Sequence, residues 1–425
     1  MKRIYTVLLS LLVFLNAHSQ DFGSFLDSLY QQNEYFKLRN VLQHNPGKAD
    51  RLREKYYQAL LDNKFNHPQQ SAAAINDLFT ENNLSDSQKT DLYKAQVFNY
   101  LNQYDYKKAG EWVEKAMQHA LARGDSSTYD GYKNVKNITD GLADAPPQSI
   151  DKHGDITMKY KRDIAGLIRL PVWVNAATES TPYIFDSGAN ISVITESEAK
   201  KINFKYSSGG LKVKGVGGHN IESGIGVADS FKIGSITLRN VALLVLPDET
   251  LTARFLFLKY SIKGIIGFPV MQQLKEIQIT KKQITVPAVT TPDNSNNMAL
   301  SGYSPVILMR TEKNDSVNFV FDSGAKITLL FNTFYKKYNY LFDPGLKTKT
   351  MTVIGAGGRK KIKVKKLKRL PLTTGESKAT LKKVAVYMDD FDINVDYLGI
   401  IGQDYIQQFK GLTMNFEYMY IKLEN

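Results

Sequence analysis

The sequence contains no cysteine among its 425 residues. This absence excludes disulfide bonds, a thiol nucleophile and a lipid attached through cysteine. Histidine is also scarce, and the six histidines show neither metal-ligand spacing nor a His-Glu-x-x-His motif. The Gly-x-Ser-x-Gly motif of serine hydrolases is missing as well. We therefore expect no metal and no cofactor.

Long apolar runs are missing too, apart from one near the start of the chain. Residues 1–19 have the pattern of an export signal: Lys2 and Arg3 precede an apolar run from Val7 to Leu15, and small residues surround His18. This run is too short for a permanent anchor, and no later run is longer. We expect a signal peptide at 1–19, no integral membrane segment after its cleavage, and an exported protein in the periplasm or outside the cell.

The charge is unbalanced, with a formal net charge of +13. Such an excess could indicate a nucleic-acid partner. Lys2 and Arg3 belong to the predicted leader, however, and much of the remainder lies in one run from Lys360 to Arg369. That run alternates imperfectly, as a strand with one solvated face would, and the alternative is a site for acidic partners. We expect no nucleic-acid partner.

Residues 20–148 have a helical pattern, with apolar residues at spacings of three and four. The segment from Tyr104 to Met117 resembles the second helix of a tetratricopeptide repeat, with small residues at Ala109 and Ala116 where helices would approach. A weaker copy spans residues 66–79. An ordinary set of helical hairpins would show the same spacing, so both interpretations stay open. Either scaffold could bind a protein partner.

From residue 149 the pattern changes to short β-rich runs separated by Gly, Asn and Ser. Residues 143–148, with two prolines, are expected to form a linker, and residues 287–297 are expected to form a second one. One short helix is expected to begin after Thr195, because Thr195 and Glu198 have the spacing of a capping box.

This second part contains an internal duplication. Each copy has an apolar strand that ends on Asp-Ser-Gly-Ala, then a glycine-rich turn, then Gly-Ile-Ile-Gly. The paired landmarks are Asp186 and Asp322, Ser187 and Ser323, Gly188 and Gly324, the turns at 215–218 and 355–358, and the segments 264–267 and 399–402. The offsets between the copies are 136 at the aspartates (322 − 186), 140 at the turns (355 − 215) and 135 at the last segments (399 − 264). We expect two units of domain size, at 149–290 and 291–425.

A duplicated carboxylate suits one kind of chemistry. Two carboxylates that face each other across a two-fold axis cannot both ionise easily, so they share one proton over a broad acid range. The ionised member can deprotonate a water while the protonated member donates to a carbonyl. These two roles are sufficient for peptide hydrolysis without a covalent intermediate.

Residues 155–425 resemble the retropepsin-like and pepsin-like aspartic proteases. The resemblance implies an all-β, two-lobed acid protease fold for these residues. With the helical pattern before them, we expect a multidomain protein in which an all-α, tetratricopeptide-like domain of helical hairpins comes first. It implies a catalytic pair, Asp186 and Asp322. Ser187, Gly188, Ser323 and Gly324 would support the active-site loops. The flap tips would be Gly215, Gly217 and Gly218 in one lobe and Gly355, Gly357 and Gly358 in the other.

The resemblance predicts an exported aspartic endopeptidase that acts on peptides or proteins. A single chain with both lobes would be a monomer with a pseudo-two-fold catalytic domain. The second copy follows the family more closely: Gln403-Asp404 comes after its last glycine, whereas the first copy has Phe268-Pro269. The alternative is a catalytically inactive relative that binds peptides or serves as a scaffold, because fold alone does not establish activity.

Overall fold

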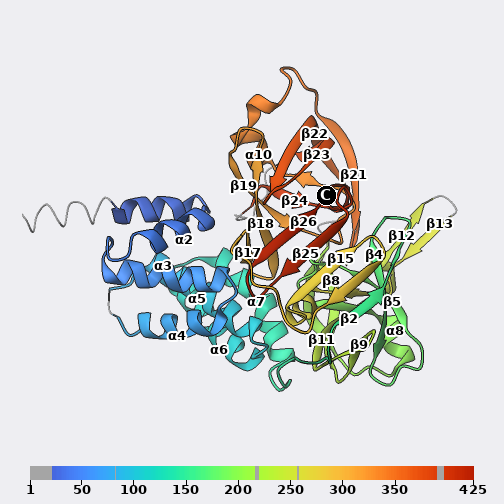
Figure 1. Cartoon of the computed structure of the whole chain (residues 1–425). Helices are drawn as coiled ribbons and strands as arrows, with labels where there is room; N and C mark the ends of the chain where they lie inside the picture. Colours follow the sequence, from blue (N-terminus) through green and yellow to red (C-terminus); the bar gives the residue numbers. More distant parts are fainter. Residues whose placement is uncertain (1–21, 82, 216–219, 256–257, 390–396) are drawn as a thin grey trace, which may run out of the picture.

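A helical N-terminal region is followed by a largely β region with curled sheets (Figure 1). The structure is a computed structural model. It describes residues 22–81, 83–215, 220–255, 258–389 and 397–425. The predicted signal peptide at 1–19 lies outside these residues. No helix in the described ranges is long and apolar enough to cross a membrane.

The helical region begins with residues 22–31. The next helices are α2 (Tyr35–His44), α3 (Arg51–Lys64), α4 (Pro68–Leu78), α5 (Asp86–Asn102), α6 (Tyr106–Ala122) and α7 (Ser126–Gly141). Polar side chains cap the N-termini of several of these helices. Ser85 and Gln88 form a complete capping box at α5, and the Asp125 side chain accepts a hydrogen bond from the Thr128 N–H at α7. Ala109 and Ala116 are buried in α6, as expected where helices pack closely. The tetratricopeptide relationship itself stays a prediction.

The first sheet contains eleven strands. Its hydrogen-bonded order is β1-β10-β9-β4-β5-β14-β6-β11-β8-β7, and β3 pairs with β4. These strands are β1 (Ser149–Asp151), β3 (Lys161–Arg162), β4 (Ile168–Val174), β5 (Thr181–Phe185), β6 (Ser192–Thr195), β7 (Ser207–Lys214), β8 (Asn220–Ala228), β9 (Phe231–Ile233), β10 (Ile236–Arg239), β11 (Val241–Leu246) and β14 (Gly264–Ile266).

The second sheet repeats most of this order. It runs β17-β18-β19-β24-β20-β23-β22-β21, so its last seven strands correspond one by one to β4-β5-β14-β6-β11-β8-β7. Parallel and antiparallel pairings also agree: β14 is parallel to β5, and β24 is parallel to β19. The strands are β17 (Met298–Ser301), β18 (Ser304–Thr311), β19 (Ser316–Phe321), β20 (Leu329–Leu330), β21 (Lys349–Gly355), β22 (Gly358–Thr374), β23 (Ser377–Tyr387) and β24 (Gly399–Ile401).

A five-stranded sheet joins the two halves. Its order is β2 (Ile156–Lys159), β16 (Gln283–Val286), β15 (Glu276–Thr280), β25 (Gly411–Asn415) and β26 (Tyr420–Glu424). β15 and β25 are antiparallel, with Glu276 opposite Asn415. Glu276 is fully buried and accepts hydrogen bonds from the Asn415 amide and from the N–H of Thr291, in the predicted second linker. The C-terminal hairpin is therefore fixed to a strand from the first half.

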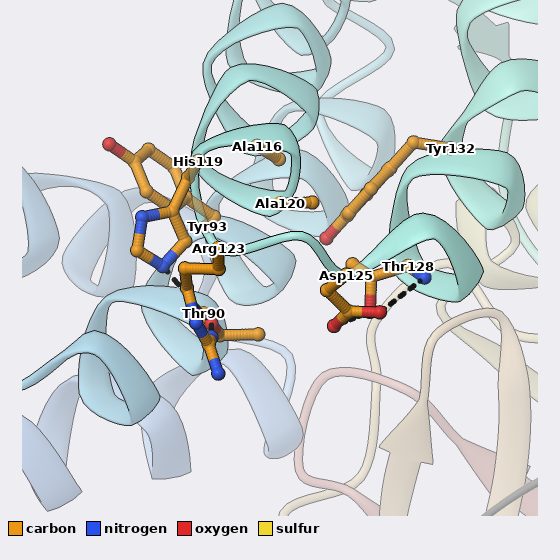
Figure 2. Close-up of a pocket in the computed structure, with 9 residues that line it drawn as sticks. All are labelled: Thr90, Tyr93, Ala116, His119, Ala120, Arg123, Asp125, Thr128 and Tyr132. Carbon is orange, nitrogen blue, oxygen red and sulfur yellow. Dashed lines mark hydrogen bonds between the residues drawn. The ribbon is translucent and has the colours of Figure 1, made fainter.

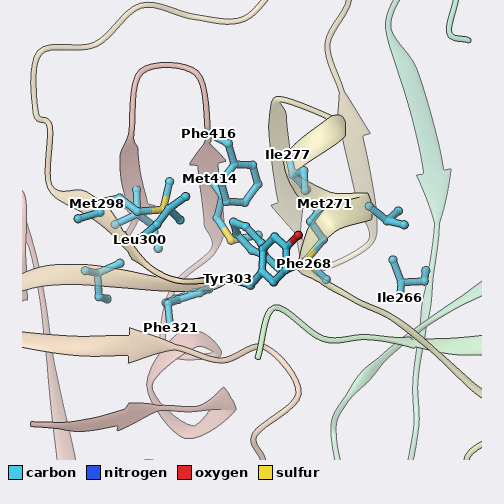
Figure 3. Close-up of a cluster of buried hydrophobic side chains, with 14 of the residues drawn as sticks. Ile266, Phe268, Met271, Ile277, Met298, Leu300, Tyr303, Phe321, Met414 and Phe416 are labelled. Atoms are coloured by element: carbon cyan, nitrogen blue, oxygen red, sulfur yellow. The ribbon is translucent and has the colours of Figure 1, made fainter. Parts of the chain in front are cut away.

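One apolar cluster lies where the three sheets meet (Figure 3). It combines Ile266 of β14 and Phe321 of β19 with side chains of the five-stranded sheet and of the short helix α9 (Phe268–Gln273). Phe321 and Ile266 are both fully buried. Because Phe321 directly precedes Asp322, this cluster supports the end of that strand.

The helical region packs against this assembly at several places. The Tyr104 hydroxyl donates to the Pro269 carbonyl at 2.9 Å, and the Asn66 amide donates to the Phe416 carbonyl at 2.6 Å. The Asn318 amide donates to the Asn33 carbonyl at 3.2 Å. Gln148, in the predicted first linker, is buried and also donates to Pro269. Helices and sheets are thus in direct polar contact.

One local prediction is wrong in part. Helix α8 (Glu196–Lys201) begins after Thr195 as expected, but no side-chain capping hydrogen bond forms there. Glu198 instead pairs with Lys201 and accepts a hydrogen bond from Thr181. The Thr195 N–H, which a capping box would pair with Glu198, donates instead to the Lys263 carbonyl at 3.1 Å.

Candidate active site

Two matched strand ends place Asp186 and Asp322. β5 and β19 are buried strands, and each aspartate follows directly after the last residue of its strand. Neighbouring strands fix the backbone there: the Asp186 N–H donates to the Ile266 carbonyl at 3.1 Å, and the Asp322 N–H donates to the Ile401 carbonyl at 3.0 Å. The two aspartates therefore have equivalent positions in the two sheets.

The two loops approach each other so closely that only glycine fits beside each carboxylate. A Cβ atom added to Gly188 would lie 2.6 Å from Cγ of Asp322, and one added to Gly324 would lie 2.2 Å from Cγ of Asp186. Each glycine thus lies against the aspartate of the other loop. The structure brings all four of these predicted residues together.

Ser187 and Ser323 cross-link the loops. The Ser187 hydroxyl accepts from the Ser323 N–H at 3.0 Å and donates to the Phe321 carbonyl at 2.8 Å. The Ser323 hydroxyl accepts from the Ser187 N–H at 3.0 Å and donates to the Phe185 carbonyl at 2.8 Å. Both serines are essentially inaccessible to solvent. These cross-links are symmetric, because the corresponding distances in the two loops are equal.

The carboxyl groups of Asp186 and Asp322 hydrogen-bond to each other. Burial, the Asp322 charge and the hydrogen bond with Asp322 together raise the pKa of Asp186 well above its ordinary value. Burial also raises the pKa of Asp322, but hydrogen bonds from Asp186 and from the N–H groups of Gly324 and Ala325 oppose this rise. The pair can therefore hold one proton where isolated carboxylates would have lost both.

The Gly-Ile-Ile-Gly segments support the loops from behind. A Cβ atom at Gly267 would lie 2.8 Å from the Ala189 carbonyl oxygen, and one at Gly402 would lie 2.8 Å from the Ala325 carbonyl oxygen. The Gly267 N–H donates to the Ser192 hydroxyl, as the Gly402 N–H donates to the Thr328 hydroxyl. The absence of a side chain at these glycines lets each segment pack directly on the active-site loop.

The predicted flap turns approach each other at Gly215 and Gly357. A Cβ atom at Gly215 would lie 2.7 Å from the Gly357 Cα atom, so the two turns touch. Gly355 pairs with Gly358 across the β21–β22 turn, where Gly357 and Gly358 have φ angles of +86° and +114° that favour glycine. Gly217 and Gly218 lie outside the described residues. The run from Lys360 to Arg369 lies in β22 and has mostly exposed cations, as predicted for a solvated strand.

Sequence reasoning missed two residues near the loops, Arg162 and Gln403. Gln403 is buried beneath the Asp322 loop and donates to the Ser323 carbonyl at 2.8 Å. Arg162, 241 positions earlier, donates to the Gln403 side chain at 3.0 Å. The mismatch between Gln403-Asp404 and Phe268-Pro269 was the only signal in the sequence that pointed to this place.

Neither of two other features competes with this site. A cavity of about 10 Å³ between α5, α6 and α7 is lined by residues that include Thr90, His119 and Tyr132 (Figure 2). This volume is enough for about one water molecule. Among the residues that the structure describes, no group of three or more His, Asp or Glu side chains is arranged to hold a metal ion.

Comparison with known proteins identifies the first half of this arrangement. Residues 170–270 match the family model described as aspartyl protease. The match contains the Asp186 loop and the Gly264–Gly267 segment, and it ends before the second copy begins. No curated protein matches the chain. The chain therefore contains an aspartyl protease-like domain.

Proposed function

We propose that the protein is an exported aspartic endopeptidase that hydrolyses peptide bonds with a water activated between Asp186 and Asp322. The observation that carries this proposal is the reciprocal packing of the two loops, in which each carboxylate lies against the glycine of the other loop. Such packing holds two acids together although their mutual repulsion costs free energy. A turn with a purely structural role would have no benefit that offsets this unfavourable free energy.

The reaction needs one proton on the pair. The ionised carboxylate takes a proton from the water, the resulting oxygen nucleophile attacks the carbonyl carbon, and the protonated carboxyl donates its proton to the carbonyl oxygen. The tetrahedral intermediate then breaks its C–N bond: the carboxyl that took the water proton gives it to the amine, and the other carboxylate takes a proton from a hydroxyl of the intermediate, which restores the pair. Water and peptide are consumed, and an acid and an amine are produced.

The wider organisation belongs to the same proposal. The two sheets with matched strand order would be the lobes of one monomeric catalytic domain, with lobe boundaries at 149–290 and 291–425. The touching turns at Gly215 and Gly357 would be flap tips that cover a bound peptide or protein substrate. The helices of residues 20–148 would form a tetratricopeptide-like domain that can bind a protein partner. Export through residues 1–19 would place the enzyme in the periplasm or outside the cell.

Hydrolysis of a peptide library at several pH values, with and without pepstatin, tests this function. We expect cleavage that pepstatin inhibits and a bell-shaped dependence of rate on pH. Activity should fall at low pH as the ionised carboxylate becomes protonated, and at high pH as the shared proton is lost. Because the Asp186 pKa is raised, the alkaline limb should lie well above about 4, the ordinary carboxyl value.

If the protein binds pepstatin but cleaves no peptide at any pH, the proposal of an enzyme is contradicted. It would favour the inactive peptide-binding protein instead. Mass spectrometry of the library identifies cut bonds, and isothermal calorimetry with pepstatin measures binding separately. The Asp186→Asn/Asp322→Asn double variant is the control for contaminating peptidases, since it should retain almost none of the activity.

A further inference from the structure

A chain of hydrogen bonds runs from the surface of the first sheet to Asp322. Arg162, in β3, donates to the side-chain oxygen of Gln403 at 3.0 Å, and the Gln403 amide nitrogen donates to the Ser323 carbonyl at 2.8 Å. The N–H of the same peptide group, on Gly324, donates to Oδ1 of Asp322 at 2.8 Å. In all three bonds the hydrogen points toward Asp322. We call Arg162 and Gln403 the relay residues.

This orientation makes the chain electrically directional. Arginine is always cationic in proteins, so it withdraws electron density from the Gln403 amide. An amide polarised at its oxygen is a stronger donor at its nitrogen, and the effect passes through the Ser323–Gly324 peptide group in the same sense. The last donor faces a carboxylate, and hydrogen bonds to ionised acceptors are the stronger kind. The chain therefore stabilises negative charge on Asp322.

Neighbouring groups fix the geometry of the relay. Gln403 is 2% exposed, and its backbone N–H donates to the Ala325 carbonyl at 2.9 Å. Gln407 donates to the same Gln403 oxygen at 3.1 Å. Arg162 makes a second hydrogen bond to the Gly166 carbonyl at 2.7 Å. The Gln403 amide is thus held in one orientation.

Among the residues that the structure describes, no equivalent chain of hydrogen bonds reaches the other active-site loop. Phe268 occupies the position that corresponds to Gln403, and its N–H donates to the Ala189 carbonyl at 2.8 Å in the same manner. Its side chain has no hydrogen-bond donor and packs instead against Tyr303 and Phe416 (Figure 3). A site with near-symmetric loops is therefore polarised from one side only.

We propose that Arg162 and Gln403 hold the negative charge of the carboxylate pair on Asp322 and leave the shared proton on Asp186. The inference rests on the proposed function and assigns the two roles in it. Asp322 becomes the base that deprotonates the water, and Asp186 becomes the acid that protonates the carbonyl oxygen. Arg162 and Gln403 are positioning residues, because they act through the Ser323–Gly324 peptide group.

Other charged and titratable groups agree with this assignment. Asp186 is an ionisable group that interacts with Asp322, and burial raises the pKa of both carboxyls. Near Arg162, Tyr160 accepts a hydrogen bond from the guanidinium group, whereas Asp163 binds Arg169 and Tyr260 instead. Lys326, in the Asp322 loop, is exposed. No nearby carboxylate neutralises Arg162 among the contacts that the described residues make.

NMR titration of aspartate labelled with ¹³C at the carboxyl carbon tests the proposal in the full chain. In the wild type we expect Asp322 to ionise first, with signals assigned from Asp186→Asn and Asp322→Asn. Gln403→Leu should raise the pKa of this first ionisation by about one unit, since one polarised donor is lost. Arg162→Met should raise it less, because the guanidinium is exposed and screened.

Lys161→Met is the matched control, because it removes the same charge from the adjacent exposed position of β3. It should leave both ionisations unchanged. In hydrolysis assays Gln403→Leu should move the acid limb of the pH profile upward and leave the alkaline limb in place. A merely structural role would lower the rate at every pH without moving a limb.

Two outcomes would overturn the relay: Asp186 ionises first, or Arg162→Met and Gln403→Leu titrate like Lys161→Met. If Gln403→Leu does not fold, Arg162→Met decides, since its side chain lies at the surface. The titration does not depend on turnover. A relay confirmed by NMR in a protein that cleaves nothing would therefore refute the proposed function alone, and a cleaving enzyme without titration shifts would refute the relay alone.

Discussion

Asp186→Asn and Asp322→Asn should each reduce hydrolysis by about a thousandfold or more, as expected for groups that act as one unit. Asparagine keeps the shape of the side chain and removes the acid–base chemistry. Because the two carboxyls act as one unit, the double variant should be hardly slower than either single variant. Single-turnover assays on a cleaved library peptide measure the effect, and fluorescence or circular dichroism confirms that each variant is folded.

The same substitutions should stabilise the fold at neutral pH. Both carboxyls have a raised pKa in the folded protein, so the folded state binds protons more tightly than the unfolded chain does. Stability is therefore lost as pH rises from the unfolded pKa toward the folded one. Asparagine removes that loss, and the midpoint of thermal unfolding should rise at pH 7 but change little at pH 3.

For the activity prediction, a folded single variant with near-normal turnover would refute the shared-proton mechanism.

Ser187→Ala and Ser323→Ala should each lower the free energy of unfolding by about 2–4 kcal/mol, because each leaves one buried N–H and one buried carbonyl without a partner. Since these bonds cross between the loops, the variants should also lose activity per folded molecule. Ser187→Thr should retain much of both properties, because it keeps the hydroxyl. Urea unfolding and active-site titration with pepstatin measure the two effects.

Ser71→Ala is the matched control for these cross-links. Ser71 is also fully buried, but it lies in α4, where its hydroxyl donates to the Ala59 carbonyl and accepts from Asn99. It should show a similar loss of stability with normal activity per folded molecule. If Ser187→Ala behaved in the same way as Ser71→Ala, the serines would stabilise the fold without positioning the carboxylates.

The duplicated motif predicted the geometry around Asp186 and Asp322 because its information is local. Strand, aspartate, serine and glycine follow one another in sequence, and duplication implies that two such ends face each other. Arg162 and Gln403 could not be predicted in this way. They meet through a single polar contact between distant residues, and one contact produces no periodic pattern in either segment.

The packing of the helices against the β region could not be predicted from the sequence either. Pro269 differs from its counterpart Asp404, and this difference suggested only a departure from the family pattern. In the structure the Pro269 carbonyl accepts hydrogen bonds from both Tyr104 and Gln148, whereas Asp404 binds Thr328 within its own half. The pattern of apolar residues defines which faces are buried, but it does not specify which surface covers them.

The pairing of β15 with β25 must form late in folding, after the strands between them have been made. Glu276 and Asn415 are neighbours in the sheet but 139 positions apart in the chain, and such non-local contacts slow folding because long loops must close first. Until β25 has been synthesised, the edge of β15 that pairs with it is open and can pair with other chains. Chains that end before β25 are therefore expected to aggregate through this exposed edge.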